Sequence, residues 1–236
     1  MALPIVNSSR YTTTIPSTGV EVEYRPYLVK EEKILMIAME SKDNVAITKA
    51  VKDVIKACVI GEVDVNRLAT FDLEFLFLKL RAKSVGEVAE ISLKCVECDH
   101  PNEVSLNLDK LEVKGLTEGQ DNVIQITDTV GITMRYPSVS DVSGINPEDL
   151  GKISVVMKLI VGCMENIFDA DAVYACKDET TKSVQDFLDS LNSAQFKKIA
   201  EFLQKIPAIS ETIQFTCTEC KHENELELRG LESFFS

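Results

Sequence analysis

The feature that most constrains the fold of this chain is a pair of matched cysteine motifs. Each motif consists of two cysteines separated by two residues, Cys95 with Cys98 and Cys217 with Cys220. A two-residue gap allows a tight turn to present both sulfurs to one metal ion, and two such turns complete a tetrahedron of thiolates. The sequence therefore predicts a single metal site with Cys95, Cys98, Cys217 and Cys220 as its ligands.

The surroundings of the two motifs are matched as well. A shift of 122 positions, which places Cys217 on Cys95, gives identical residues at eight positions, in the first copy Ile91, Cys95, Glu97, Cys98, His100, Asn102, Glu103 and Leu106. Apolar and polar residues alternate over residues 89–93 and 104–108, on the two sides of the first motif, and alternation with a period of two is typical of β-strands. Each motif is therefore expected at the tip of a β-hairpin, as in a zinc ribbon.

The two halves of this ribbon lie far apart in the sequence, with 118 residues between Cys98 and Cys217. We expect a largely helical region to be inserted between them. The predicted fold class is α+β, consisting of a helical body with β-hairpins and a split four-cysteine zinc ribbon.

Other uses of the four cysteines remain open at this point. An iron–sulfur cluster uses the same ligands, the four cysteines can be buried free thiols, and two CxxC pairs can serve a redox function. A redox pair of the thioredoxin kind opens a helix, whereas these pairs precede strands. A structural zinc is favoured, and an iron–sulfur cluster is the weaker choice. His100 and His222, the only histidines, are expected to support the thiolates or to pack in the turns.

The rest of the chain alternates between hairpin and helix patterns. Apolar residues at helical spacing predict helices at residues 30–39, 45–58, 70–83, 147–163, from 183 onward, and 194–205. Thr70 and Asn146 are expected to cap two of these helices, and Ser183 is expected to open a third. The expected segments are 1–30, an N-terminal β-hairpin arm; 31–86, a helical segment; 87–113, the first zinc-knuckle hairpin; 114–210, a hairpin plus helical insert; and 211–236, the second zinc-knuckle hairpin with an apolar C-terminal tail. Phe234 and Phe235 of that tail are expected to pack on the ribbon or to dock into another subunit.

The charge and cysteine content limit the possible partners and compartments. The net charge is −13, and its even distribution argues against binding to a phosphate backbone or to an anionic membrane surface. The remaining cysteines, Cys58, Cys163 and Cys176, are interpreted as unreactive thiols, which fit a reducing cytoplasm. The first residues lack the features of a signal peptide, and no stretch approaches a membrane span.

The sequence contains no motif that predicts catalysis. It has no phosphate-binding glycine loop, zinc-protease helix or nucleophile elbow. A zinc ion with four thiolates has no open position for water or substrate, so we do not expect an enzyme. Acidic residues surround both motifs and no aromatic residues are interleaved for base stacking. A zinc-ribbon nucleic-acid or transcription accessory protein is therefore the second hypothesis, and a CxxC redox protein is the third.

Four further stretches are distinctive: IPSTG at 15–19, YRPYLVKEEK at 24–33, FDLEFLFLKLRAKSVGE at 71–87 and MRYP at 134–137. Together with the cysteine motifs they resemble the baseplate hub protein family of T4-like contractile-tailed bacteriophages, over most of the chain. The resemblance implies a structural subunit or assembly factor of the baseplate hub. Its expected partners are other phage tail or baseplate proteins in an oligomeric assembly, with no nucleic acid and no membrane. Its expected location is the host cytoplasm during assembly, and the virion tail baseplate if it is retained.

Overall fold

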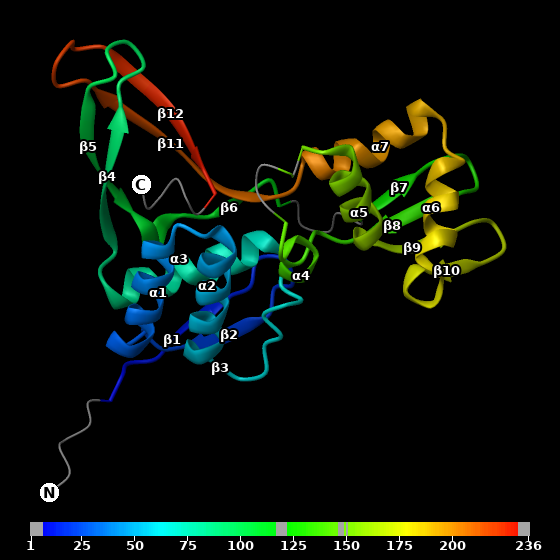
Figure 1. Cartoon of the computed structure of the whole chain (residues 1–236), viewed down its shortest axis with the longest axis horizontal. Helices are drawn as coiled ribbons and strands as arrows, with labels where there is room; N and C mark the ends of the chain where they lie inside the picture. The colour runs from blue at the N-terminus through cyan, green and yellow to red at the C-terminus, as the bar shows by residue number, and fades with distance from the viewer. Residues whose placement is uncertain (1–6, 117–121, 146–148, 150, 231–236) are drawn as a thin grey trace, which may run out of the picture. The chain divides into compact units, whose positions relative to one another are not determined.

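The computed structural model describes residues 7–116, 122–145, 149 and 151–230. Helices and small antiparallel sheets make up the chain, which confirms the predicted α+β class (Figure 1). The chain divides into two compact units, Met1–Lys114 with Pro207–Ser236, and Gly115–Ile206. We call these unit 1 and unit 2. The expected positions of Phe234 and Phe235 and of the helix start at Asn146 lie outside the described residues.

Unit 1 begins with a three-stranded sheet and three helices. The sheet has the order β1-β2-β3, and the elements are β1 (Tyr11–Thr14), β2 (Glu21–Tyr24), α1 (Val29–Ser41), α2 (Asn44–Cys58), β3 (Val59–Ile60) and α3 (Thr70–Ser84). Helix α2 places Val54 and Ile55 in the interior with no exposed surface. Helix α3 buries apolar side chains on several sides, among them Phe71 and Leu76, as its continuous apolar sequence predicts.

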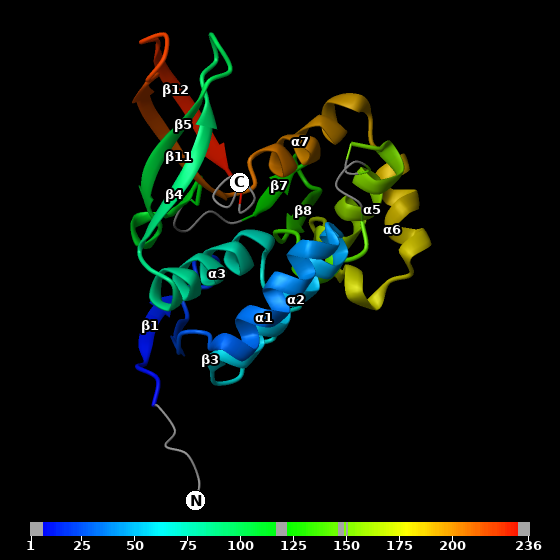
Figure 2. The ribbon, with the colours of Figure 1, turned by 60° about the vertical axis from the view of Figure 1, so that its left-hand side comes forward.

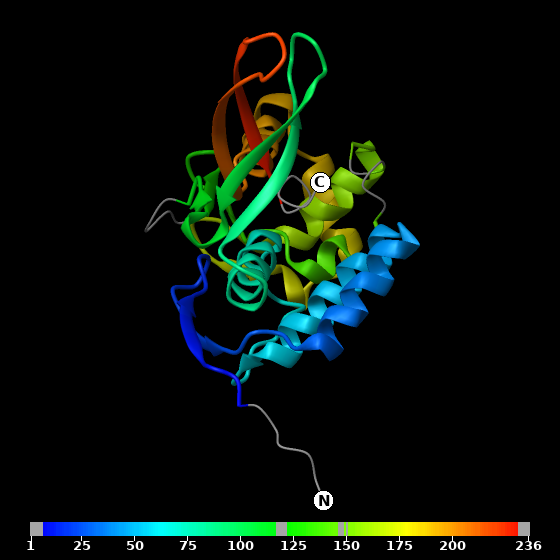
Figure 3. The same ribbon diagram turned by 90° about the vertical axis from the view of Figure 1, so that its left-hand side faces the viewer.

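Two long hairpins complete unit 1. They consist of β4 (Val88–Lys94) with β5 (Pro101–Asn107), and β11 (Ala208–Thr216) with β12 (Glu223–Arg229). Short elements join them to the rest of the unit, η1 (Leu108–Lys110) and β6 (Val113–Lys114), of which β6 pairs with β11. The apolar sides of both hairpins share one core with α3, through residues such as Leu78, Leu108 and Ile209. Figures 2 and 3 show the two hairpins side by side, although 100 residues separate them in sequence.

The described part of unit 2 contains a four-stranded antiparallel sheet and four α-helices. The sheet has the order β10-β9-β8-β7. The elements are β7 (Val123–Gln125), β8 (Gly131–Met134), α4 (Val139–Val142), α5 (Ile153–Cys163), β9 (Met164–Phe168), β10 (Val173–Ala175), η3 (Cys176–Asp178), α6 (Thr181–Asp189) and α7 (Ser193–Gln204). Ile132, Ile160 and Ile199 form the centre of its core, each with no exposed surface. Within the described residues, no helix combines the length and the hydropathy needed to cross a membrane.

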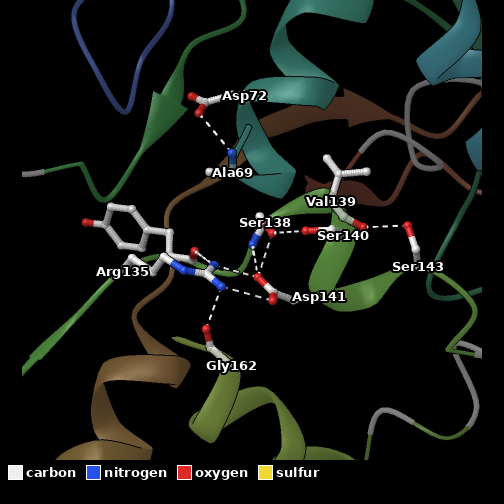
Figure 4. Close-up of polar contacts among 10 residues, drawn as sticks. Ala69, Asp72, Arg135, Ser138, Val139, Ser140, Asp141, Ser143 and Gly162 are labelled. Carbon is white, nitrogen blue, oxygen red and sulfur yellow. Dashed lines mark hydrogen bonds and ion pairs between the residues drawn. The ribbon is translucent and has the colours of Figure 1, made fainter. Parts of the chain in front are cut away.

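Two expected helix starts were wrong in detail. Helix α3 is capped at Ala69, whose N–H donates to the Asp72 carboxylate (3.2 Å) (Figure 4), and not by Thr70. Helix α6 begins at Thr181, because the Thr180 hydroxyl accepts from the backbone N–H of Ser183 (3.1 Å). Each error concerns a local hydrogen bond that the periodicity of apolar residues does not encode.

Candidate metal centre

The four cysteines of the matched motifs come together at the tips of the two long hairpins. The Sγ atom of Cys95 lies 3.6 Å from that of Cys220, and Cys98 lies 3.7 Å from Cys217 and 3.4 Å from Cys220. All four sulfurs lie within 4.8 Å of one another. A tetrahedron with metal–sulfur bonds of about 2.3 Å has sulfur–sulfur edges of about 3.8 Å. The four sulfurs are therefore placed so that they can hold one metal ion.

Each motif folds into the same tight turn. In the first, the N–H of Cys95 donates to the carbonyl of His100 (3.0 Å), and the N–H of Asp99 donates to the carbonyl of Cys95 (3.0 Å). Asp99 has a φ of 56°, in the left-handed region. The second turn repeats all three features with Cys217, Lys221 and His222, at 2.8 Å, 3.1 Å and a φ of 62°. The eight shared residue types thus specify one local structure twice.

The two turns are linked by two asparagines, one from each hairpin. The Oδ1 of Asn102 accepts from the backbone N–H of Thr218 (2.8 Å), and its amide donates to the sulfur of Cys217 (3.7 Å). Conversely, the Oδ1 of Asn224 accepts from the backbone N–H of Val96 (2.9 Å). Both asparagines are buried, at 4% and 3% exposure. A buried amide that satisfies its hydrogen bonds across two segments fixes their relative position.

The sequence predicts no role for these asparagines. It predicts instead that the two histidines support the thiolates or pack in the turns. The structure uses the backbone of His100 and His222, since each carbonyl accepts from the first cysteine of its motif. The asparagine side chains also donate to these two carbonyls, at 2.8 and 3.0 Å. Asn102 and Asn224 were among the eight identities, so the signal was present. Its meaning depends on a contact across more than 100 residues, which sequence spacing alone does not reveal.

The two cysteines of each motif differ in acidity in the same way. Burial raises the pKa of Cys95, but the backbone amides of Glu97 and Cys98, with the side chain of Asn224, outweigh it and lower the pKa. Burial and the corresponding amides act on Cys217 in the same way, and its pKa is lowered to about 6. The backbone amide of His100 lowers the pKa of Cys98, but the neighbouring thiols and burial raise it to about 12. The first cysteine of each motif is thus held as the more readily ionised ligand.

The three other cysteines lie outside this centre. Cys58 and Cys163 have no exposed surface, and burial raises their pKa values to about 11 and about 12. Cys176 is half-buried in η3. The interpretation of Cys58 and Cys163 as packed thiols is therefore confirmed.

The fold and the cysteine centre define the class of this protein: an α+β protein whose two distant hairpins meet at a four-sulfur site. Comparison with protein families gives a match to the T4 bacteriophage base plate protein family over residues 8–236. The chain belongs to this family. It is therefore a structural protein of a phage baseplate, in the virion tail, and it interacts with other tail proteins. No curated protein and no solved structure matches it.

We expect Asn102→Ala to weaken the junction between the two hairpins. The backbone N–H of Thr218 then loses its acceptor, which costs about 1–2 kcal/mol of unfolding free energy. Denaturant unfolding measures this loss, and amide hydrogen exchange at Thr218 locates it. Asn66→Ala, at an exposed position, serves as the control. Equal stability of the two variants would contradict the bridging role of Asn102.

Proposed function

We propose that this protein is a structural or assembly subunit of the baseplate hub, held together by a structural zinc ion on Cys95, Cys98, Cys217 and Cys220. The family match over residues 8–236 supports the baseplate role, and the stretches that resemble hub proteins support the more specific position. The protein acts through contacts with other proteins and not as an enzyme, since a closed shell of four thiolates leaves no position for a substrate.

The geometry of the sulfurs favours one shared ion. Three sulfur–sulfur pairs, at 3.4–3.7 Å, join one hairpin to the other. A redox CxxC pair needs only the two sulfurs of its own motif, so these contacts between the hairpins give the redox hypothesis weaker support. An iron–sulfur cluster bonds its cysteines to several irons and spaces them more widely than a single ion does. Zinc is the divalent ion best suited to four thiolates in a tetrahedron.

The metal would act by closing a long loop. It would join the turn at Cys95 to the turn at Cys220 and so fix the two ends of the intervening chain, which includes the whole of unit 2. Loop closure reduces the entropy of the unfolded chain, and metal binding contributes its free energy directly to folding. The zinc thus stabilises both hairpins and the core that they share with α3.

The alternative of a zinc-ribbon nucleic-acid or transcription accessory protein has weak support. The hairpin tips carry exposed carboxylates, including Glu97, Asp99, Glu219 and Glu223, which would repel a phosphate backbone. The net charge of −13 acts in the same direction. Retention on DNA at moderate salt would favour this alternative.

We expect Cys95→Ser to lower the metal content and the thermal stability together. Loss of one thiolate opens the site, and a cost of about 3 kcal/mol lowers the melting temperature by about 6–12 °C. Cys176→Ser, which changes a cysteine outside the cluster, serves as the control. Metal analysis of the purified protein distinguishes zinc from iron. Unchanged metal stoichiometry and melting temperature in Cys95→Ser would refute the structural zinc.

Among the described elements, helix α1 carries the largest number of exposed large apolar side chains, which makes it a candidate surface for a contact with another baseplate protein. Only Glu31, Leu35 and Ala38 of this helix are buried, whereas Ile37 is 68% and Met36 is 57% exposed. Other large exposed residues lie on the same helix, namely Val29, Ile34 and Met39. A helix that is apolar on several sides but buried on one side is typical of a surface that a partner covers.

We expect Ile37→Glu to reduce incorporation into baseplates while it leaves the free protein stable. The side chain is exposed, so the unfolding free energy should change by no more than about 0.5 kcal/mol. Val20→Glu changes an exposed apolar residue outside α1 and serves as the control. Mass spectrometry of purified tails measures incorporation and distinguishes a retained subunit from a transient assembly factor. Normal incorporation of Ile37→Glu would exclude α1 as the contact surface, and a density map of the tail tests the hub position.

A further inference from the structure

An arginine in unit 1 joins a strand to the end of one helix and the start of another. The backbone N–H of Arg25, which follows β2, donates to the carbonyl of Cys58 (3.0 Å), the last residue of α2. Its guanidinium donates to the carbonyl of Ala57 (3.0 Å) and to the Glu31 carboxylate (3.0 Å). Glu31 also accepts from the backbone N–H of Leu28 (2.8 Å), the N-cap of α1. Arg25 thereby satisfies helix-end carbonyls that have no partner within the helix.

An arginine in unit 2 makes the same set of bonds. The backbone N–H of Arg135, which follows β8, donates to the carbonyl of Cys163 (2.8 Å), the last residue of α5. Its guanidinium donates to the carbonyl of Gly162 and to the Asp141 carboxylate (3.0 Å). Asp141 accepts from the backbone N–H of Ser138 (2.7 Å), the N-cap of α4. Figure 4 shows Arg135 between Asp141 and the Gly162 carbonyl.

The two loops agree in sequence spacing and in strand register. The carboxylate is six residues after the arginine in both, as Glu31 after Arg25 and as Asp141 after Arg135. In unit 1, the last residue of β2, Tyr24, pairs with Val59, the residue after the helix-ending cysteine. In unit 2, the last residue of β8, Met134, pairs with Met164, which again follows the helix-ending cysteine. Both strand pairs are antiparallel.

The order of elements extends this agreement to the hairpin tips. Each half begins with a hairpin and the arginine loop, which lead into a first helix and then a second helix that ends in cysteine. A strand that pairs with the hairpin comes next, and a further helix and a cysteine-tipped hairpin follow it. The elements are β1, β2, α1, α2, β3, α3, β4 and β5 in the first half, and β7, β8, α4, α5, β9, α7, β11 and β12 in the second. Six of the seven cysteines then correspond in pairs, 58 with 163, 95 with 217 and 98 with 220. Cys176 lies in η3, between β10 and α6, which have no counterpart in the first half.

We infer that residues 11–107 and 123–229 are two repeats of one folding module, and that the hairpin tip of each repeat is the surface that binds the other. The contacts between the two tips agree with this correspondence, because replacing each residue by its counterpart turns one contact into another. The bond from the Thr218 N–H to Asn102 becomes that from the Val96 N–H to Asn224, and the sulfur pair 95–220 becomes 217–98. The repeats differ from the two compact units because the second tip hairpin belongs to unit 1.

This assignment gives Arg25 and Arg135 one shared role as positioning residues. Each holds the last turn of one helix, α2 or α5, against the sheet and also holds the carboxylate at the start of the preceding helix, α1 or α4. A lysine has the same charge but cannot donate in several directions from one planar group. The equivalence of the two loops depends on their hydrogen bonds and not on whether the cysteines bind a metal.

The inference is tested in the full-length protein by Arg25→Lys and Arg135→Lys, with hydrogen exchange as the readout. We expect exchange to accelerate by about tenfold at residues 59–60 in the first variant and at residues 164–168 in the second. Arg10→Lys, at an exposed arginine that contacts Glu23, should change neither region. The repeat is refuted if either substitution leaves its own strand as protected as in the unmodified protein.

A second variant tests the equivalence of the tips. The triple substitution Thr218→Val, Lys221→Asp and Glu223→Pro converts the second tip into the sequence of the first. Proline is tolerated at 223 if the position corresponds to Pro101, which faces Lys94 as Glu223 faces Thr216. Thr218→Val removes the bond from the Thr218 hydroxyl to Asn102 (3.0 Å), so we expect a melting temperature lowered by no more than about 4 °C. Glu225→Pro, two positions further along β12, should lower it much further. A triple variant as unstable as Glu225→Pro would overturn the equivalence, whether or not the site binds zinc.

Discussion

The junction of the two hairpin tips is the contact on which the arrangement of unit 1 depends. It joins segments separated by 118 residues, and such a closure has an entropic cost that local interactions do not offset. Four sulfurs and two buried asparagines form the junction, and the apolar core around α3 lies along the same hairpins. The polar contacts at the tips fix the position of one tip against the other, while burial of apolar surface supplies most of the stabilising free energy.

The arginine loops solve a different problem, the termination of a helix next to a sheet. The last carbonyls of a helix lack partners within it, and burying them beside a strand is costly unless a donor is supplied. Arg25 and Arg135 supply donors from the backbone and the side chain at once. Burial raises the pKa of Asp141, but its bonds with Arg135 and Ser138 outweigh this and lower the pKa. The pKa of Glu31 is lowered in the same way by Arg25 and Leu28, so both carboxylates remain charged partners.

The sequence was sufficient to predict the α+β class and the hairpins at the cysteine motifs, because alternation with a period of two and repeated spacing are local properties. It was not sufficient for the roles of Asn102, Asn224 and the two arginines. Their partners are close in space but distant in sequence, as Arg25 is from Ala57. The interval of six residues from arginine to carboxylate is the same in both loops and can be seen in the sequence. Its structural role becomes clear only when the structure places each arginine next to the cysteine that ends a distant helix.

The differences between the repeats indicate which surfaces are free to serve the baseplate. The common module needs only a short helix after the arginine loop, since α4 spans four residues. The corresponding helix α1 spans thirteen residues and exposes Met36 and Ile37. Exposed apolar area lowers the solubility of a free protein. Helix α1 is longer than the module needs and has an apolar exposed surface, so its length and composition require an explanation outside the shared fold. A contact with a neighbouring baseplate protein provides that explanation for α1, because its remaining surface has no role in the shared fold.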